Sequence, residues 1–239
     1  MKRNFTAILI IILLFTVNIL PQSAGGGLML GFPQGEFKDN IDRLGFGISG
    51  QALFFNPSPG APFGFGLDIG YLNYGSETRQ EPFNSNIPDV IVDVDRSNNL
   101  VNFHLLFQIA PPSGTVRPYL ELLFGGAYLW TETSVNSRGG SEEEVASNTN
   151  FDDFAWNYGA GGGLLISLYT PDVQESNFEA LYLDLKVRYL FGTEAEYLKE
   201  GSVTIQNGDV YYDVSKSKTD LIITQLGVMV YFSSFFNNN

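Results

Sequence analysis

The chain contains one histidine, His104, and the chemistry open to it depends on the groups that share its surroundings. His104 lies in an alternating segment, residues 101–109, on the same face as Asn102 and Gln108. A histidine can act as a general base, a proton carrier or a metal ligand, but each role needs a second catalytic or ligating group within reach. The sequence places no such group beside it. We therefore favour a hydrogen-bonded interior histidine.

Five charged residues lie on the corresponding face of other alternating segments: Asp68, Glu121, Asp184, Lys186 and Arg188. The last three are spaced by two, which places them on one face of a single strand. Charges enclosed in a narrow interior must be paired, because an isolated buried charge is costly. We predict that these five residues and His104 form a polar network that fills and rigidifies a closed interior. A proton or ion path is the alternative.

Two further patterns suggest ligand chemistry less strongly. Glu142, Glu143 and Glu144, with Asp152 and Asp153, could bind a divalent cation, but they lack the ligand spacing of a calcium loop, so a solvated charge run is favoured. The glycines of residues 159–165 lack the Lys-Ser/Thr that completes a phosphate loop, and close packing within a strand explains them better. We predict no catalytic residue, no cofactor and no metal.

Composition narrows the class of protein. The chain of 239 residues has no cysteine, which excludes thiolate chemistry, cysteine-based metal sites and the lipid-anchoring cysteine of a lipoprotein. A net charge of −13 argues against nucleic acid as a partner, since phosphate binding needs clustered Lys and Arg. Residues 1–24 have the basic start, apolar run and small-residue end of a cleaved signal peptide; an uncleaved anchor helix is the alternative.

The rest of the chain alternates apolar and polar residues with a period of two, which predicts β-strands. Eight such segments occur, at residues 28–32, 45–55, 63–74, 101–109, 119–130, 154–168, 181–191 and 222–232. The links after the second, fourth and sixth segments are short, and those after the third, fifth and seventh are long. In the last long link, Asn207-Gly208 between alternating runs predicts a β-hairpin. The pattern is typical of an all-β, eight-stranded antiparallel up-and-down transmembrane barrel with short periplasmic turns and long extracellular loops.

Aromatic residues collect at both ends of the predicted strands, as the two interfaces of a bilayer favour. At the short-turn end they are Phe54, Phe63, Phe65, Phe107, Tyr119, Tyr169, Phe178 and Phe232. At the long-link end they are Tyr71, Tyr128, Trp130, Trp156, Tyr158, Tyr189 and Phe191. The alternative is a secreted lipocalin-like barrel with its apolar face inward. The glycine-rich polar face suits a narrow interior better than a water-facing surface.

The last strand carries the spacing polar-x-Gly-x-x-apolar-x-aromatic at Gln225, Gly227, Val230 and Phe232. This spacing resembles the C-terminal assembly signal of bacterial outer-membrane barrels. Residues 26–232, with the opening GLMLGFPQGEF and the closing KTDLIITQLGVMVYF, resemble the small outer-membrane β-barrel family that includes outer-membrane protein X and the barrel-domain proteins common in Bacteroidetes. The chain departs from this pattern in that SSFFNNN follows Phe232.

The resemblance implies an outer-membrane barrel domain at residues 25–232 and a short tail at 233–239. Its implied partners are outer-membrane lipid, the barrel-assembly machinery and a surface ligand or envelope protein. The function that we expect is non-enzymatic: acidic surface loops for adhesion, envelope contact or partner binding. Alternatives are a narrow channel or an accessory barrel of a transport or secretion system and, less favoured, a lipid-modifying outer-membrane enzyme.

Overall fold

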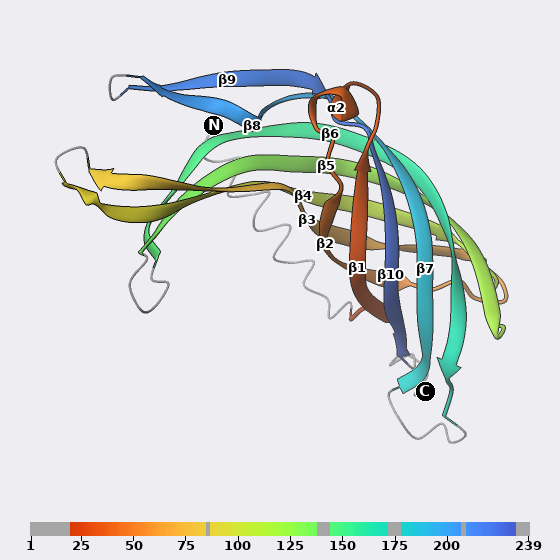
Figure 1. The fold of residues 1–239 in the computed structure, drawn as a ribbon. Coiled ribbons are helices and arrows are strands. Elements are labelled where there is room, and N and C mark those ends of the chain that lie inside the picture. Colours follow the sequence, from red (N-terminus) through yellow and green to blue (C-terminus); the bar gives the residue numbers. More distant parts are fainter. Residues whose placement is uncertain (1–19, 85–86, 138–143, 172–177, 207–208, 233–239) are drawn as a thin grey trace, which may run out of the picture.

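The chain folds as a closed antiparallel barrel in the strand order β1-β10-β7-β6-β5-β4-β3-β2, which confirms the predicted eight-stranded architecture (Figure 1). The structure is a computed structural model that describes residues 20–84, 87–137, 144–171, 178–206 and 209–232. The predicted signal peptide, apart from its last few residues, and the predicted tail lie outside the described residues. Among the described residues, no helix is long and apolar enough to cross a membrane.

The barrel strands follow the sequence pattern closely at the short-turn end and run well past it at the other end. Their bounds are β1 Ser23–Pro33, β2 Gly45–Phe55, β3 Phe63–Asn84, β4 Ile87–Ile109, β5 Val116–Ser137, β6 Glu144–Tyr169, β7 Phe178–Gly192 and β10 Leu221–Phe232. β1 includes Ser23 and Ala24, which precede the predicted domain boundary. The backbone of Gln22 already bonds to Leu53 and Phe232.

Two of the predicted long loops are largely strand, so this part of the prediction was wrong. β3 pairs with β4 beyond the barrel as far as Asn84↔Ile87, and β5 pairs with β6 as far as Asn136↔Glu144. These segments continue the barrel wall outward as a sheet, seen at the left of Figure 1. Residues 75–84 and 131–137 are mostly polar, so they lack the apolar half of a strand pattern, whereas cross-strand pairing still forms the ladder.

The last long link does contain the predicted hairpin, formed by β8 (Glu194–Gln206) and β9 (Asp209–Lys218) as a separate two-stranded sheet. Its Asn207-Gly208 turn lies outside the described residues. The first link contains a short helix that the sequence did not predict, α2 (Gly35–Asn40). A helix this short has no detectable apolar period, and it is held by a single buried side chain, Phe37.

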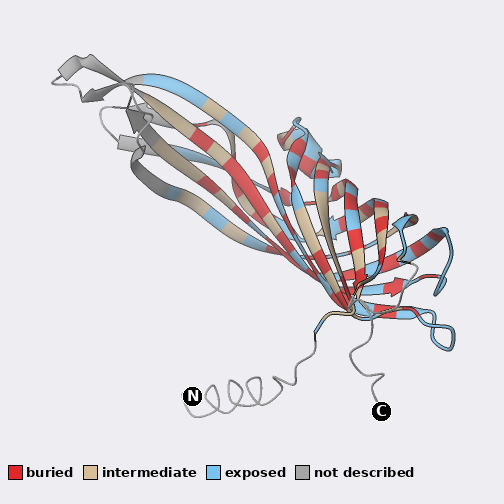
Figure 2. Ribbon diagram, turned by 90° about the horizontal axis from the view of Figure 1, so that it is seen from below, coloured by how far each residue is buried: buried red, intermediate tan, exposed pale blue. Residues whose placement is uncertain are grey.

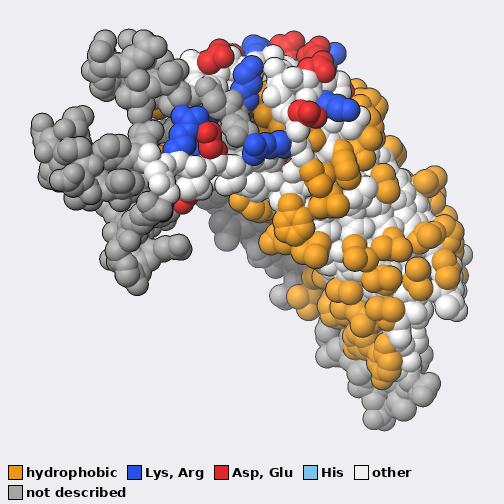
Figure 3. Space-filling view, in the orientation of Figure 1, with side chains coloured by type: hydrophobic (Ala, Val, Ile, Leu, Met, Phe, Trp, Pro, Cys, Tyr) orange, Lys and Arg blue, Asp and Glu red, His pale blue; other side chains and the backbone are white. Residues whose placement is uncertain are grey.

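The two faces of the wall differ as the sequence predicted. Figure 2 shows buried and exposed residues alternating along the strands. Along β10, Gln225 and Gly227 are buried and point inward, whereas Leu226 and Val228 are exposed and point outward. Val230 and Phe232, the other residues of the predicted assembly signal, point outward. The outward face carries large exposed apolar side chains, which cover the barrel on the face seen in Figure 3. Around the barrel they include Phe46, Ile48, Phe65, Leu67, Ile69, Phe103, Leu105, Leu120, Leu122, Phe124, Leu185, Val187, Leu226 and Val228.

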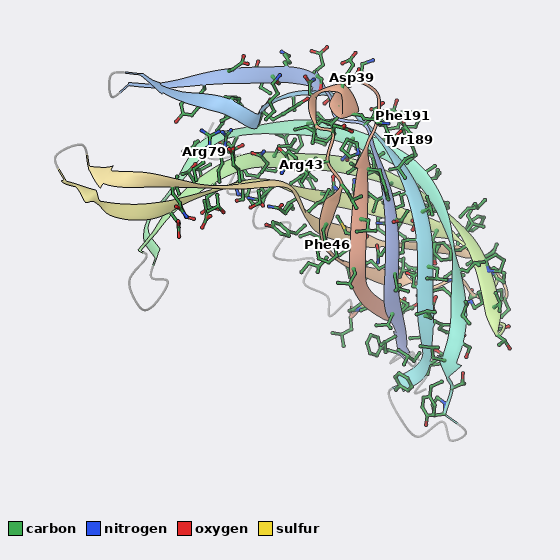
Figure 4. The ribbon with its side chains drawn as sticks, in the orientation of Figure 1. Asp39, Arg43, Phe46, Arg79, Tyr189 and Phe191 are labelled. Atoms are coloured by element: carbon green, nitrogen blue, oxygen red, sulfur yellow. The ribbon has the colours of Figure 1, made fainter. Side chains whose placement is uncertain are left out.

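The aromatic ends of the strands pair across neighbouring strands. Phe63 stacks on Phe107 at the short-turn end, and Tyr158 stacks on Phe191 at the other end. Figure 4 places Tyr189 and Phe191 together at the outer end of β7. Tyr119 was predicted to lie in the aromatic girdle at the short-turn end, and this prediction was wrong. Its side chain is buried inside the barrel, because Tyr119 lies two residues from Glu121 on β5 and therefore on the same, inward face.

The seam where the first strand meets the last is closed through glycines. Gly27 of β1 lies opposite Gly227 of β10, and a Cβ atom added to Gly27 would fall 2.5 Å from the Gly227 Cα. A side chain at this position would force the two backbones apart. The glycine of the predicted assembly signal is therefore also a packing requirement of barrel closure.

Candidate functional site

The structure places all six residues of the predicted network inside the barrel, and Arg188 is their centre. Arg188, on β7, is 3% exposed. Its Nη1 donates to Asp68 Oδ2 at 2.8 Å and its Nε donates to Glu121 Oε1 at 2.5 Å. The guanidinium thus bridges β3 and β5 across the interior. This forked geometry suits Arg and would not be reproduced by Lys.

A second pair lies one step along β7. Lys186 Nζ is 2.8 Å from Asp184 Oδ2, and both side chains are buried. Tyr119 Oη donates to the other Asp184 oxygen at 2.6 Å. Gln51 joins the two pairs, since its Oε1 accepts from Lys186 Nζ and from Arg188 Nη2. The interior is therefore one connected ionic layer, which we define as Gln51, Asp68, His104, Tyr119, Glu121, Asn157, Asp184, Lys186 and Arg188.

His104 belongs to this ionic layer. Its Nε2 is 2.8 Å from Asn157 Oδ1, and its Nδ1 is 3.4 Å from Asp68 Oδ1. Asn157 Nδ2 in turn donates to Asn102 Oδ1 at 3.0 Å. Both ring nitrogens therefore face polar partners inside a closed wall, and the ring is buried away from any surface that a substrate could reach.

Glycines of β6 provide the space for the large polar side chains. A Cβ atom at Gly163 would fall 2.5 Å from the Tyr119 ring, and one at Gly161 would fall 2.8 Å from Arg188 Cγ. These glycines belong to the 159–165 run, which lies within β6 as expected. The run serves packing of the interior: an eight-stranded barrel leaves only enough room for side chains to fill.

The interior is closed at the short-turn end by Arg117. Its guanidinium carbon lies 4.8 Å from the ring centroid of Tyr231 and 5.3 Å from that of Tyr182. Its Nε donates to the carbonyl of Pro111 at 2.8 Å. A cation over two aromatic faces is stabilised without a carboxylate partner. Arg117 was not among the predicted interior residues, although its parity, shared with Tyr119 and Glu121, places it on the inward face.

The outer end is closed by a different kind of layer, the apolar cap, which we define as Phe37, Leu72, Tyr74, Leu100, Leu129, Leu190, Tyr197 and Leu221. Phe37 packs edge-on against Tyr74 and Tyr197, with ring centroids 5.8 and 5.2 Å apart. Burial raises the pKa of the Tyr74 phenol well above its usual range, so it is neutral at physiological pH. α2 and β8 thus cover the barrel with aromatic rings.

The acidic run of the long link after the fifth predicted strand divides between described and undescribed residues. Glu142 and Glu143 lie outside the described residues, and the side chain of Glu144 is not described. Asp152 accepts from Tyr128 Oη at 2.9 Å, and Asp153 accepts from the backbone N–H of Glu196 at 2.7 Å. These two carboxylates therefore join β6 to β5 and to the β8–β9 hairpin. Within the described ranges, no three His, Asp or Glu side chains are placed to hold a metal ion.

Side chains fill the barrel interior along its length. Cations, carboxylates and amides cross the middle of the barrel, Arg117 closes one end and the apolar cap closes the other. Partners such as Gln51, Tyr119 and Asn157 were absent from the predicted network, although their inward parity was visible in the sequence. The interior is suited to holding the wall rigid, and within the described part of the chain both ring nitrogens of His104 face polar partners.

Comparison with known proteins leaves the family open. No family model matches the chain, and no curated protein matches it. Three solved structures are similar over 88% of this chain. They are Neisserial surface protein A (96% of that chain, 13% identity, TM-score 0.37), Ail, the attachment invasion locus protein of Yersinia pestis, in complex with the heparin analogue sucrose octasulfate (97%, 16%, 0.33), and a major outer membrane protein from Thermus thermophilus (99%, 12%, 0.37). TM-scores this low do not establish a family or a function.

Proposed function

We propose that the chain is a non-enzymatic outer-membrane barrel that anchors the extended β3–β6 sheet and the β8–β9 hairpin at the cell surface for binding. The observation that carries this proposal is the inversion of polarity in the wall: Leu, Phe, Ile and Trp side chains face outward while charged residues face inward. Exposing so large an apolar belt to water would be unfavourable, whereas a bilayer solvates it. The lipocalin-like alternative requires the opposite arrangement.

The proposed orientation places the short turns in the periplasm and the outer sheet outside the cell. The chain lacks cysteine, so single cysteines can be introduced without background labelling. Lys216 is exposed on β9, and Ser113 is exposed in the short turn between β4 and β5. With a membrane-impermeant maleimide, K216C should label on intact cells and S113C only after the outer membrane is opened. Labelling of S113C alone on intact cells, or recovery of the protein in the soluble fraction, would refute the proposal.

The channel or secretion-accessory alternative makes a different prediction for the interior. The ionic layer and the apolar cap both lie across the path that a solute would take, which supports a barrel that does not conduct. Purified protein in planar bilayers should therefore show no stepwise conductance. Reproducible single-channel steps that are sensitive to substitution of Arg188 would favour the channel.

The lipid-modifying enzyme is the least supported alternative. Such an enzyme needs an accessible catalytic group near the membrane rim, whereas His104 is enclosed in the ionic layer and engaged at both nitrogens. Replacing His104 should therefore alter stability and leave the outer-membrane lipid composition unchanged. Lipid analysis of cells that carry H104N is the measurement.

A further inference from the structure

A small cavity lies at the outer rim, apart from the ionic layer. Its volume is about 170 Å³, and it is lined by the last residue of α2 and the link that follows (residues 40–43) and by the first outer residues of β3 and β4. Figure 4 shows Arg43, from this link, above the lipid-facing Phe46, while Arg79 lies farther out along β3. Since a water molecule occupies about 30 Å³, the cavity has room for about six waters or one small organic molecule.

Two buried donors in the cavity lining have no hydrogen-bond partner within the described part of the chain: Arg96 Nε and Tyr74 Oη. Arg96 is 9% exposed and Tyr74 is 2% exposed. The Arg96 guanidinium is fixed from its other side, where Nη2 donates to the Lys199 carbonyl at 3.3 Å and to Ser202 Oγ at 3.1 Å. Buried donors without a protein acceptor are uncommon in folded proteins, and either an ordered water or a ligand can supply the acceptor.

The charges of the lining limit the kind of acceptor. Arg43 and Arg96 face the same cavity as Asp42 and Glu77, and the other lining residues are uncharged, so the formal charges cancel. Burial lowers the pKa of Arg96, and the carboxylate of Glu77 opposes this effect. A multiply charged anion would meet two carboxylates here. A singly charged ligand with several hydroxyl groups would match both the unpaired donors and the carboxylate acceptors.

We propose that this cavity binds a small hydroxy acid with one carboxylate and several hydroxyl groups, such as a sugar acid, either free or at the end of a glycan. The carboxylate accepts from Arg96 Nε and Tyr74 Oη, and the hydroxyls donate to Asp42 and Glu77. This site deepens the surface-binding function proposed above and relies on it only for access from outside the cell.

The chain offers a matched pair of variants. Tyr74 and Tyr197 both pack against Phe37, but only the Tyr197 hydroxyl has a partner, Ser217 Oγ at 2.6 Å. Y74F removes an unpaired donor and should leave the unfolding midpoint unchanged or slightly raised. Tyr197 itself does not line the cavity, although its hydroxyl also interacts with the side chain of Asn40, which does. Y197F removes a made hydrogen bond, so it should lower the midpoint and change ligand affinity much less than Y74F.

The test is calorimetric titration of the refolded full-length mature barrel in detergent with glucuronate, glucose and inorganic phosphate. We expect glucuronate to bind, glucose and phosphate to bind at least about tenfold more weakly, and Y74F to lose about tenfold in affinity for glucuronate, as the loss of a hydrogen bond to a charged group implies. R96K should also weaken the binding of glucuronate, because Lys lacks the Nε–H donor. A disaccharide that ends in a uronate distinguishes the two sources of ligand. If the natural ligand is the end of a glycan, this disaccharide should bind as tightly as glucuronate. If the natural ligand is a free acid, only glucuronate should bind tightly.

Three results would overturn the proposal: equal affinity for glucose and glucuronate, binding of phosphate alone, or unchanged glucuronate affinity in Y74F. Absence of any binding would also reject it. These outcomes are independent of surface labelling at K216C, so the cavity proposal can fail while the proposed outer-membrane function stands.

Discussion

The ionic layer across the middle of the barrel and the apolar cap at its outer end are both buried, but different interactions hold them together. In the ionic layer, Arg188 meets Asp68 and Glu121 through directed bonds of 2.8 and 2.5 Å. In the apolar cap, Phe37 meets two tyrosine rings through edge contacts that fix no atom-to-atom partner. The comparison teaches that a charge enclosed in a barrel depends on each particular partner, whereas an apolar side chain depends on the volume that it fills.

The largest effect should come from removing the centre of the ionic layer. R188A leaves Asp68 and Glu121 buried without their cation, and breaking a buried ion pair in this way costs about 4 kcal/mol. The free energy of unfolding, measured by urea titration in detergent and checked by heat-modified gel mobility, should fall accordingly. R188K is the control: it keeps the charge but not the fork, so it should retain only part of the stability. An unchanged urea midpoint in both variants would show that the ionic layer does not hold the wall.

A somewhat smaller effect is expected in the apolar cap. F37A removes the ring that seals the outer end and should cost about 3 kcal/mol through lost burial and a residual cavity. F37L should recover most of this loss, because volume matters more than identity in such a layer. Neither variant should open a conducting path, since the ionic layer still crosses the barrel. Ion conductance through F37A would show that the apolar cap alone blocks the barrel, and that the ionic layer does not.

Tyr119 tests one bond within the ionic layer. Y119F removes the hydroxyl that donates to Asp184 but leaves the Lys186 partner in place, so the loss should be about 1.5 kcal/mol. The urea midpoint relative to wild type measures it. A loss as large as that of R188A would indicate that Lys186 does not hold Asp184 without help from Tyr119.

The smallest effect should come from an ion pair outside the barrel. Arg79 Nε is 2.6 Å from Glu77 Oε1, close to the Arg188 distances, but the Arg79 side chain is 45% exposed. Solvent screening reduces such a pair to about 0.5 kcal/mol or less. R79A should therefore leave the urea midpoint nearly unchanged, which isolates burial as the cause of the difference between the two arginines.

The sequence was sufficient to predict which residues of each barrel strand face inward and which face outward. Alternation at Asp184, Lys186 and Arg188 predicted an inward face because lipid on one side and a crowded interior on the other impose a period of two. The partners within that interior could not be assigned, since they depend on the stagger between strands: Arg188 reaches Asp68 and Glu121 on two different strands. Tyr119 had the inward parity as well, but its aromatic type suggested the interface.

The outer parts were harder to predict for a different reason. Residues 75–84 are almost entirely polar, so the segment 75–99 looks like a polar loop, although residues 75–84 pair with residues 87–98. α2 is too short for a helical period, and the interaction that fixes it, Phe37 between Tyr74 and Tyr197, joins distant parts of the chain. Arg96 and Tyr74 likewise come to one cavity only through folding.

The unbroken passage of β3 to β6 from the membrane-facing wall into the outer sheet has a mechanical consequence. A pull on the tips of this sheet acts along the strands, so that many peptide hydrogen bonds carry the load in parallel instead of failing one after another. A flexible loop of the same composition would first stretch and then transmit little force. In the orientation proposed above, a partner that binds the outer end would hold a stiff sheet continuous with the barrel, and tension on that sheet would reach the barrel wall directly.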